Sequence, residues 1–184
     1  MLEIPDNSKK DKPMSKTHFK FMEKHFRKRD KNYPPQKKIE KTKITKGSII
    51  LDYGCGPGSY SIAAAEAVSN AGKVYAVDIH PLAIESVKKR ATEKKLINIE
   101  TILTDCDTNL QDGSVDVVLL LDIYHDLSDP ESILKELHRV LKEDGSLSVD
   151  DHHFKGDEII EKITSIGLFK FVERIEEVYN FVKL

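Results

Sequence analysis

Three glycines at alternate positions follow a short apolar stretch of the chain. Residues 49–58 read IILDYGCGPG, and a segment with small residues, expected to be helical over 60–69, comes next. Glycine lets the backbone turn sharply at the carboxyl end of a strand and lets a ligand approach the main chain, because no Cβ intrudes. The pattern indicates a ligand-binding loop, although a glycine-rich loop by itself is also found as a simple turn.

Asp78 ends the next expected strand, about 20 residues after the last glycine of the loop, where an acid can accept hydrogen bonds from both hydroxyls of a ribose. It could also be an ordinary cap for the helix expected from Pro81, but the glycine loop before it favours the ribose role. A dinucleotide is disfavoured, because its G-x-G-x-x-G fingerprint needs glycine at Ser59 and because Asp52 would lie poorly beside a pyrophosphate. A ligand with an ammonium group can instead use the Asp52 carboxylate, directly or through water.

Two later segments carry groups that can accept a proton. Residues 122–126 read DIYHD and follow an expected strand over 115–121, and residues 150–153 read DDHH and follow one over 147–149. Carboxylates and imidazoles act as general bases within hydrogen-bond reach of a proton, so the catalytic candidates are Asp122, His125 and His152. The DDHH run could also hold a metal with Asp122 or His125. Adjacent residues of a strand point to opposite faces and cannot all converge, however, so no metal site is predicted.

These segments lie in a chain where short apolar runs alternate with helical patterns. Strands are expected over 48–51, 74–77, 99–103, 115–121 and 147–149, with helices over 60–69, 81–95 and 130–142 between them. This alternation predicts an α/β fold, in which a parallel sheet has helices on both faces. The tail differs, because a helix near 157–165 is followed by strand-like runs over 168–175 and 178–184. The gap of about two residues between these runs is too short for a parallel crossover, so one of them is expected to run antiparallel.

The N-terminal quarter of the chain differs in charge from the rest. Residues 1–46 contain 15 Lys and Arg against 6 Asp and Glu, a net +9, whereas the remainder has 14 against 25, a net −11. A basic arm can contact nucleic acid. Phe19, Met22 and Phe26 are spaced to line one face of a helix over 17–31, however, and this favours a docking helix over a nucleic-acid arm.

The length of 184 residues fits one compact domain with a short extension. We expect a basic extension with a lid helix over 1–46 and the main domain over 47–184. Within the extension, 1–16 should be loose, Pro34 and Pro35 should end the first helix, and a second helical stretch is expected over 36–43. Two cysteines without a CxxC pair, and no apolar run of roughly 18 residues, predict a cytoplasmic protein without disulfides or membrane spans.

Residues 48–150 resemble the class I S-adenosylmethionine-dependent methyltransferases, in particular the small-molecule branch of the methyltransferase type 11 kind. Five motifs carry the resemblance in order: the glycine loop at 51–58, Asp78, TDC at 104–106, DGSVDVV at 112–118, and LHRVLK at 137–142 with Gly145. Two departures, Glu143-Asp144 for a usual Pro-Gly and Val115 for a common Phe, leave the resemblance intact.

The resemblance implies a Rossmann-like, doubly wound and mostly parallel seven-stranded sheet with an antiparallel last strand and helices on both faces. It implies that S-adenosylmethionine binds at the glycine loop and leaves as S-adenosylhomocysteine, after in-line methyl transfer to a small-molecule acceptor. His125 occupies the position of a histidine often seen in the family after the fourth strand. The implied cofactor-binding residues are Asp52, Tyr53, Gly54, Cys55, Gly56, Gly58, Asp78, Ile79, Asp105, Cys106 and Leu121.

N-terminal helices roof the acceptor pocket in similar methyltransferases, so the resemblance implies that the 17–31 helix and the 33–35 segment do so here. Arg27 and Arg29 would then favour an anionic acceptor. Two alternatives stay open: a module that binds S-adenosylmethionine or S-adenosylhomocysteine without catalysis, and an RNA or protein methyltransferase. Only the basic arm suggests the latter. It is disfavoured because residues 122–125 read DIYH where many amino-group methyltransferases have Asn/Asp-Pro-Pro-Tyr/Phe.

Overall fold

Seven strands form one mixed sheet in the order β3-β2-β1-β4-β5-β7-β6. In the computed structural model, which describes residues 11–184, the strands are β1 (Ile49–Tyr53), β2 (Lys73–Asp78), β3 (Ile99–Leu103), β4 (Val115–Leu121), β5 (Leu141–Asp150), β6 (Phe169–Ile175) and β7 (Val178–Lys183). Neighbouring strands are parallel except for β7, which runs antiparallel to both β5 and β6. The predicted doubly wound sheet with an antiparallel last strand is confirmed.

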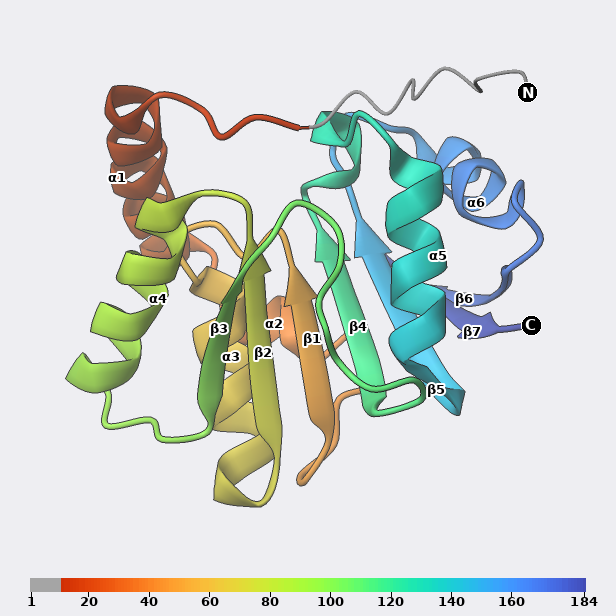
Figure 1. Ribbon diagram of the computed structural model, residues 1–184, viewed down its shortest axis with the longest axis horizontal. Helices are drawn as coiled ribbons and strands as arrows, with labels where there is room; N and C mark the ends of the chain where they lie inside the picture. The colour runs from red at the N-terminus through yellow and green to blue at the C-terminus, as the bar shows by residue number, and fades with distance from the viewer. Residues whose placement is uncertain (1–10) are drawn as a thin grey trace, which may run out of the picture.

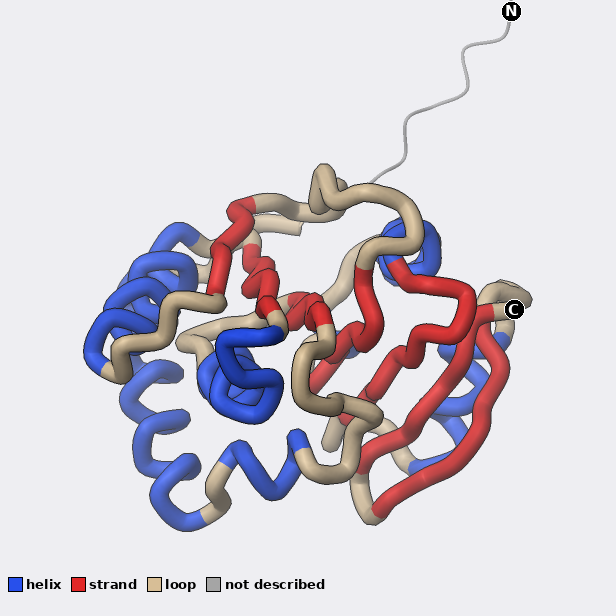
Figure 2. The backbone as a smooth tube through the Cα atoms, turned by 90° about the horizontal axis from the view of Figure 1, so that it is seen from below, coloured by secondary structure: helices blue, strands red, loops and turns tan. Residues whose placement is uncertain are grey.

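Helices cover both faces of this sheet. They are α1 (Lys16–Asn32), α2 (Pro35–Ile39), α3 (Ser59–Val68), α4 (Pro81–Glu93), α5 (Pro130–Val140) and α6 (Gly156–Thr164). α3 and α4 pack on one face, and α5 and α6 pack on the other (Figure 1). Viewed from below, the strands form a twisted layer between helices (Figure 2). The strand order reverses at β1, between β2 and β4, and the crevice at such a switch point is where open α/β sheets bind ligands.

Alternate residues of the strands supply two apolar layers. From β1, Leu51 packs in the layer beneath α5 and α6, whereas Ile50 packs against the alanine-rich face of α3. β4 contributes to both layers, with Val118 in the first and Leu119 in the second. A strand covered on both faces must be almost wholly apolar, which explains the continuous apolar run of its sequence.

The helix predicted over 130–142 is shorter than expected. α5 ends at Val140, because Leu141 already has extended backbone (φ −71°, ψ 136°) and pairs with Val115 of β4. β5 therefore begins at Leu141 instead of residue 147, and its register with β4 shifts between Val115 and Val117. Buried backbone N–H and C=O groups must be hydrogen bonded, and after Val140 they find partners in β4 instead of in a longer helix. Tertiary contacts therefore decide where α5 ends. α2 is also shorter than predicted: it ends at Ile39, whereas the helical stretch was expected over 36–43.

The N-terminal helix has the predicted extent. α1 begins after Ser15, whose hydroxyl accepts a hydrogen bond from the His18 N–H, and it ends before Pro34. Most of the segment predicted to be loose, over 1–16, lies outside the described residues, and the domain division at 46 and 47 stays a prediction. Within residues 11–184, none of the helices combines the length and hydropathy that a membrane crossing needs.

Candidate functional site

A cavity of about 550 Å³ opens at the carboxyl ends of β1, β2 and β4. Its walls come from the glycine loop after β1, the turns after β2, β3 and β4, the segment 11–14, and one face of α1. Cavities of roughly 300–1,000 Å³ hold most small-molecule ligands and cofactors, so this one is of suitable size.

Two glycines of the loop are required by packing. Gly54 (φ +72°) and Gly58 (φ +85°) both adopt left-handed backbone. A Cβ would lie 2.4 Å from Ile123 Cγ1 at Gly54 and 2.7 Å from Val87 Cγ2 at Gly58. These glycines let the strand turn tightly against β4 and α4.

Gly56 faces the cavity and is held by Asp78. A Cβ at Gly56 (φ +51°) would meet nothing closer than Met22 and Phe26 of α1, each 4.0 Å away. The Asp78 carboxylate accepts the Gly56 N–H at 2.8 Å and the His80 N–H at 2.7 Å. Burial raises the pKa of Asp78, and these two hydrogen bonds oppose the rise. Each oxygen keeps a lone pair for a hydroxyl donor, as the predicted ribose role requires.

Asp52 lies behind the loop and does not line the cavity. Its side chain is buried and accepts a hydrogen bond from the Ser61 hydroxyl. Burial raises the pKa of Asp52 to about 7; the Ser61 hydrogen bond opposes this rise and the charge of Asp78 adds to it. The predicted contact of Asp52 with a ligand ammonium, directly or through water, stays a prediction.

Most other residues predicted to hold the cofactor do line the cavity. They are Tyr53, Gly54, Cys55, Gly56, Asp78, Ile79, Asp105 and Leu121. Gly58 and Cys106 lie outside the lining, together with Asp52. Burial raises the pKa of the Cys55 thiol well above its ordinary value, so this side chain stays protonated and acts as a packing group instead of a nucleophile.

Sequence analysis missed several lining residues. Most of these follow directly after the glycine loop or after a strand, namely Ser59, Tyr60, His80, Thr104, Ile123 and Leu127. Their position after parallel strands is the signal that could have found them. Residues 11–14 also line the cavity, and no sequence pattern indicated them.

α1 roofs the cavity with the face predicted for docking, which presents His18, Phe19, Met22 and Phe26. The Phe19 and His80 rings pack with centroids 4.5 Å apart. Two carboxylates tie the helix down: Asp30 accepts the Ser59 hydroxyl at 2.5 Å, and Glu23 accepts the Ser86 hydroxyl at 2.9 Å. The roof is thus fixed to the first turn of α3 and to α4.

The arginines of α1 do not reach the cavity. Arg27 pairs with Glu23 and Arg29 with Asp30, each at 3.1 Å. Apart from Asp78 beside the glycine loop, the Asp, Glu, Lys and Arg residues of the lining are Asp11, Lys12, Asp105, Asp122 and Asp126. An anionic acceptor therefore gains no support from these arginines. The 33–35 segment does not line the cavity either, and the Tyr33 side chain is exposed.

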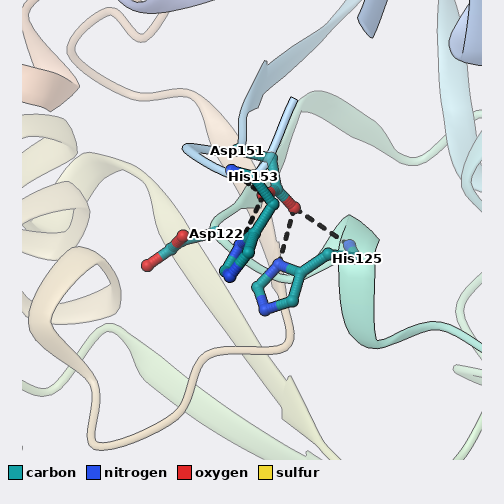
Figure 3. Close-up of side chains that lie close together, drawn as sticks. All are labelled: Asp122, His125, Asp151 and His153. Carbon is teal, nitrogen blue, oxygen red and sulfur yellow. Dashed lines mark hydrogen bonds and ion pairs between the residues drawn. The ribbon is translucent and has the colours of Figure 1, made fainter. Parts of the chain in front are cut away.

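Acidic and imidazole side chains meet where β4 and β5 end (Figure 3). The register pairs Leu121 with Asp150, so the residues that follow leave the sheet side by side. Asp151 is buried, and its carboxylate lies 2.9 Å from His125 Nδ1 and 3.2 Å from His153 Nδ1. Asp122, His125, Asp151 and His153 each present a ligand-type atom, and these four atoms all lie within 4.8 Å of one another.

The sequence predicted that the residues of the DDHH run would not all converge, and only Asp151 and His153 of that run join the cluster. Adjacent residues do diverge, because Asp150 pairs with Lys38 while Asp151 faces the histidines. His153, two positions further on, returns to the cluster, so alternate residues supply its members. Of the three catalytic candidates, Asp122 lines the cavity, whereas His125 and His152 are not part of its lining. His152 Nδ1 hydrogen bonds to the Asp122 carboxylate, and the catalytic roles stay predictions.

The chain belongs to the methyltransferase domain family, which matches residues 44–176. It is 36% identical over 102 residues to the aklanonic acid methyltransferase DauC of Streptomyces sp. (strain C5), covering 51% of this chain and 46% of that protein. It is 28% identical over 110 residues to the demethylmenaquinone methyltransferase of Geobacillus sp. (strain WCH70), covering 59% and 47%. The chain thus spans about half the length of these relatives.

A solved structure confirms the fold over nearly the whole chain. A SAM-dependent methyltransferase from Aquifex aeolicus superposes with a TM-score of 0.78 at 22% identity, covering 92% of this chain and 96% of that one. At this identity the likeness establishes the Rossmann-like architecture alone.

Proposed function

We propose that this protein transfers a methyl group from S-adenosylmethionine to a small-molecule acceptor. The observation that carries the proposal is the bare main chain at Gly56, held by Asp78 inside a cavity that α1 roofs. That cradle suits a nucleoside whose ribose hydroxyls donate to a carboxylate while its amino-acid end lies along glycine backbone. Membership of the methyltransferase domain family supports the same conclusion.

The residues around the cavity have distinct tasks in this proposal. Asp78 accepts the ribose hydroxyls, the main chain of 54–56 holds the amino-acid end, and Asp105 accepts the adenine amino group. The sulfonium supplies the reactivity, so the protein mainly positions the acceptor and excludes water. α1 excludes water from above, because Phe19, Met22 and Phe26 present apolar surface to the cavity.

The acceptor lies, in our proposal, between α1 and the turn after β4. Asp122 and Asp126 line that end, and Asp122 is placed to take a proton from an oxygen or nitrogen nucleophile. His152, bonded to Asp122, and His125 behind it are proposed to support this step. The relatives DauC and demethylmenaquinone methyltransferase are both named for small-molecule substrates, which favours an acceptor of that class over RNA or protein.

Calorimetry with Asp78→Ala tests the cofactor site. We expect S-adenosylmethionine and S-adenosylhomocysteine to bind the wild-type protein and NAD not to bind. Losing an acceptor for two buried hydroxyls costs about 1–3 kcal/mol, so Asp78→Ala should weaken binding roughly 5- to 150-fold. Asp144→Ala, an exposed acid on β5, is the matched control and should bind normally. Equal affinity of Asp78→Ala and wild type would overturn the assignment.

Transfer itself is tested separately, because a binding module without catalysis would pass the calorimetric test. The protein is incubated with methyl-labelled cofactor and a fractionated small-molecule extract. The proposal expects label in a low-molecular-weight product. Tight cofactor binding without transfer to any fraction would favour the binding module, and label in RNA or protein would redirect the acceptor class.

A further inference from the structure

We propose that Asp122, His125 and His153 bind one divalent transition-metal ion, with Asp151 orienting the two imidazoles. The four side chains come from the turns after β4 and β5; Figure 3 shows His125 and His153 beside the Asp151 carboxylate, with Asp122 next to them. Each side chain has a ligand-type atom within 4.8 Å of one on each of the others, so the three donors are close enough to share an ion once their side chains reorient. The site is separate from the cofactor cradle at Gly56 and Asp78.

The hydrogen bonds of Asp151 prepare both histidines for this role. Its two oxygens accept the backbone N–H groups of His125 and His153, at 2.9 and 3.0 Å, and each oxygen also faces the Nδ1 of the same residue. An ionised carboxylate only accepts hydrogen bonds, so Nδ1 carries the proton in each neutral ring and Nε2 keeps its lone pair. A carboxylate that fixes histidine in this way is the usual second layer of a metal site.

The side-chain partners of the Asp151 carboxylate are the imidazoles of His125 and His153. Its side chain has no exposed surface, and the described residues include no Lys or Arg in an ion pair with it. A buried carboxylate needs partners, and here they are two aromatic rings whose centroids lie 3.7 Å apart.

Asp122 completes the donor set from the cavity side; with an ion bound it would act as a ligand, in place of the base role proposed above for the metal-free site. Its backbone is left-handed (φ +61°), a conformation that is costly for a residue other than glycine and that often marks functional sites. His152 Nδ1 hydrogen bonds to its carboxylate, as a supporting residue does for a metal-binding carboxylate. Because Asp122 lines the cavity, an ion held there would stand in the cavity wall.

The donor set selects the class of ion. Two imidazoles and one carboxylate suit Zn²⁺ and neighbouring first-row ions, whereas Mg²⁺ and Ca²⁺ prefer oxygen ligands alone. Three protein ligands leave a coordination position open, and here it would face the acceptor end of the cavity. An oxygen of the acceptor could enter it, which would give the site the positive charge that Arg27 and Arg29 do not supply.

Metal titration of the chelator-treated full chain tests the proposal without any cofactor. Zn²⁺ is added in competition with a coloured chelator, and Co²⁺ provides a visible spectrum. We expect one Zn²⁺ per chain, Co²⁺ bands typical of bound imidazole, and no binding of Mg²⁺. His125→Ala and His153→Ala should each weaken Zn²⁺ binding at least tenfold, and Asp151→Asn about 10- to 100-fold.

His138→Ala is the matched control, because His138 lies on α5 and hydrogen bonds to the Leu184 carbonyl. Circular dichroism in chelator shows whether each variant folds; His153 is partly exposed, so its variant should fold even if Asp151→Asn does not. The proposal is overturned if Zn²⁺ does not bind, if His125→Ala and His153→Ala bind it as wild type does, or if His138→Ala removes it. A negative result would leave the proposed methyl transfer standing, because that proposal is tested separately by cofactor binding and by transfer of the labelled methyl group.

Discussion

Asp52 and Asp78 stand near the same edge of the sheet, yet their surroundings give them different chemistry. Asp78 receives two backbone N–H groups and lines the cavity. Asp52 receives hydrogen bonds from Ser61 alone and does not line the cavity. A buried carboxylate that has lost its water and has only the neutral donors of Ser61 is poorly stabilised, so burial raises the pKa of Asp52 to about 7.

This rise predicts a pH dependence of stability. The pKa of Asp52 in the folded protein is above its ordinary value of 3.8, so the stabilisation from its protonated form is complete below about pH 4 and lost as pH rises to about 7. The full loss corresponds to about 4 kcal/mol. Asp52→Asn should therefore unfold at higher urea than wild type at about pH 8 and show a flatter profile from about pH 4 to pH 8. Parallel profiles for the two proteins would contradict the assignment, and Asp144→Asn is the exposed control.

Replacing Gly54 or Gly56 with alanine should have different effects, mainly on stability at Gly54 and mainly on cofactor binding at Gly56. At Gly54 the new Cβ would lie 2.4 Å from Ile123, so Gly54→Ala should lose about 2–4 kcal/mol of unfolding free energy. At Gly56 the Cβ meets only the cavity, so the cost is mainly the left-handed backbone, about 1–2 kcal/mol, while S-adenosylmethionine binding should fall sharply. Urea unfolding and calorimetry measure the two effects. The interpretation fails if Gly56→Ala keeps full affinity.

Among the elements, α1 is rich in basic residues, yet it covers the cavity with its apolar face. Asp30 and Glu23 fix the helix to Ser59 and Ser86. Two of its basic residues, Arg27 and Arg29, pair with acids of the same helix. The interleaved aromatic residues therefore indicated the role of the segment better than its net charge did.

Two phenylalanines of α1 provide a matched test of the roof. Phe26 lines the cavity, whereas the Phe21 side chain is 72% exposed. Phe26→Ala should weaken S-adenosylmethionine binding about tenfold, because it removes apolar surface from the closed cavity, and Phe21→Ala should change little. Deletion of residues 1–35 should have a larger effect in the same direction, with circular dichroism to confirm folding. Unchanged affinity in both Phe26→Ala and the deletion would rule the roof out.

For the molecule as a whole, the strand order of the sheet explains why the site lies at the carboxyl ends of β1 and β4. Strand order reverses at β1, so the crossovers through α3 and α5 pass to opposite faces of the sheet (Figure 1), and the cavity opens at the carboxyl ends of β1 and β4. The glycine loop enters that cavity from β1, and the acid–histidine cluster borders it from β4 and β5. The cofactor cradle and the proposed metal site thus occupy different walls of one region.

The sequence by itself determined the order of the elements and the antiparallel tail. It also determined that the glycine loop and Asp78 lie at the ends of neighbouring strands. Each of these depends on local periodicity or on residues within one strand and its turn. Only the tertiary structure decided where α5 ends, since Leu141 leaves the helix to pair with Val115. It also decided that Asp52 lies behind the loop and that Asp151 and His153 meet His125. Those outcomes depend on strand register and on the directions of side chains in turns. Turns have no repeating pattern, so the sequence does not predict which way their side chains point.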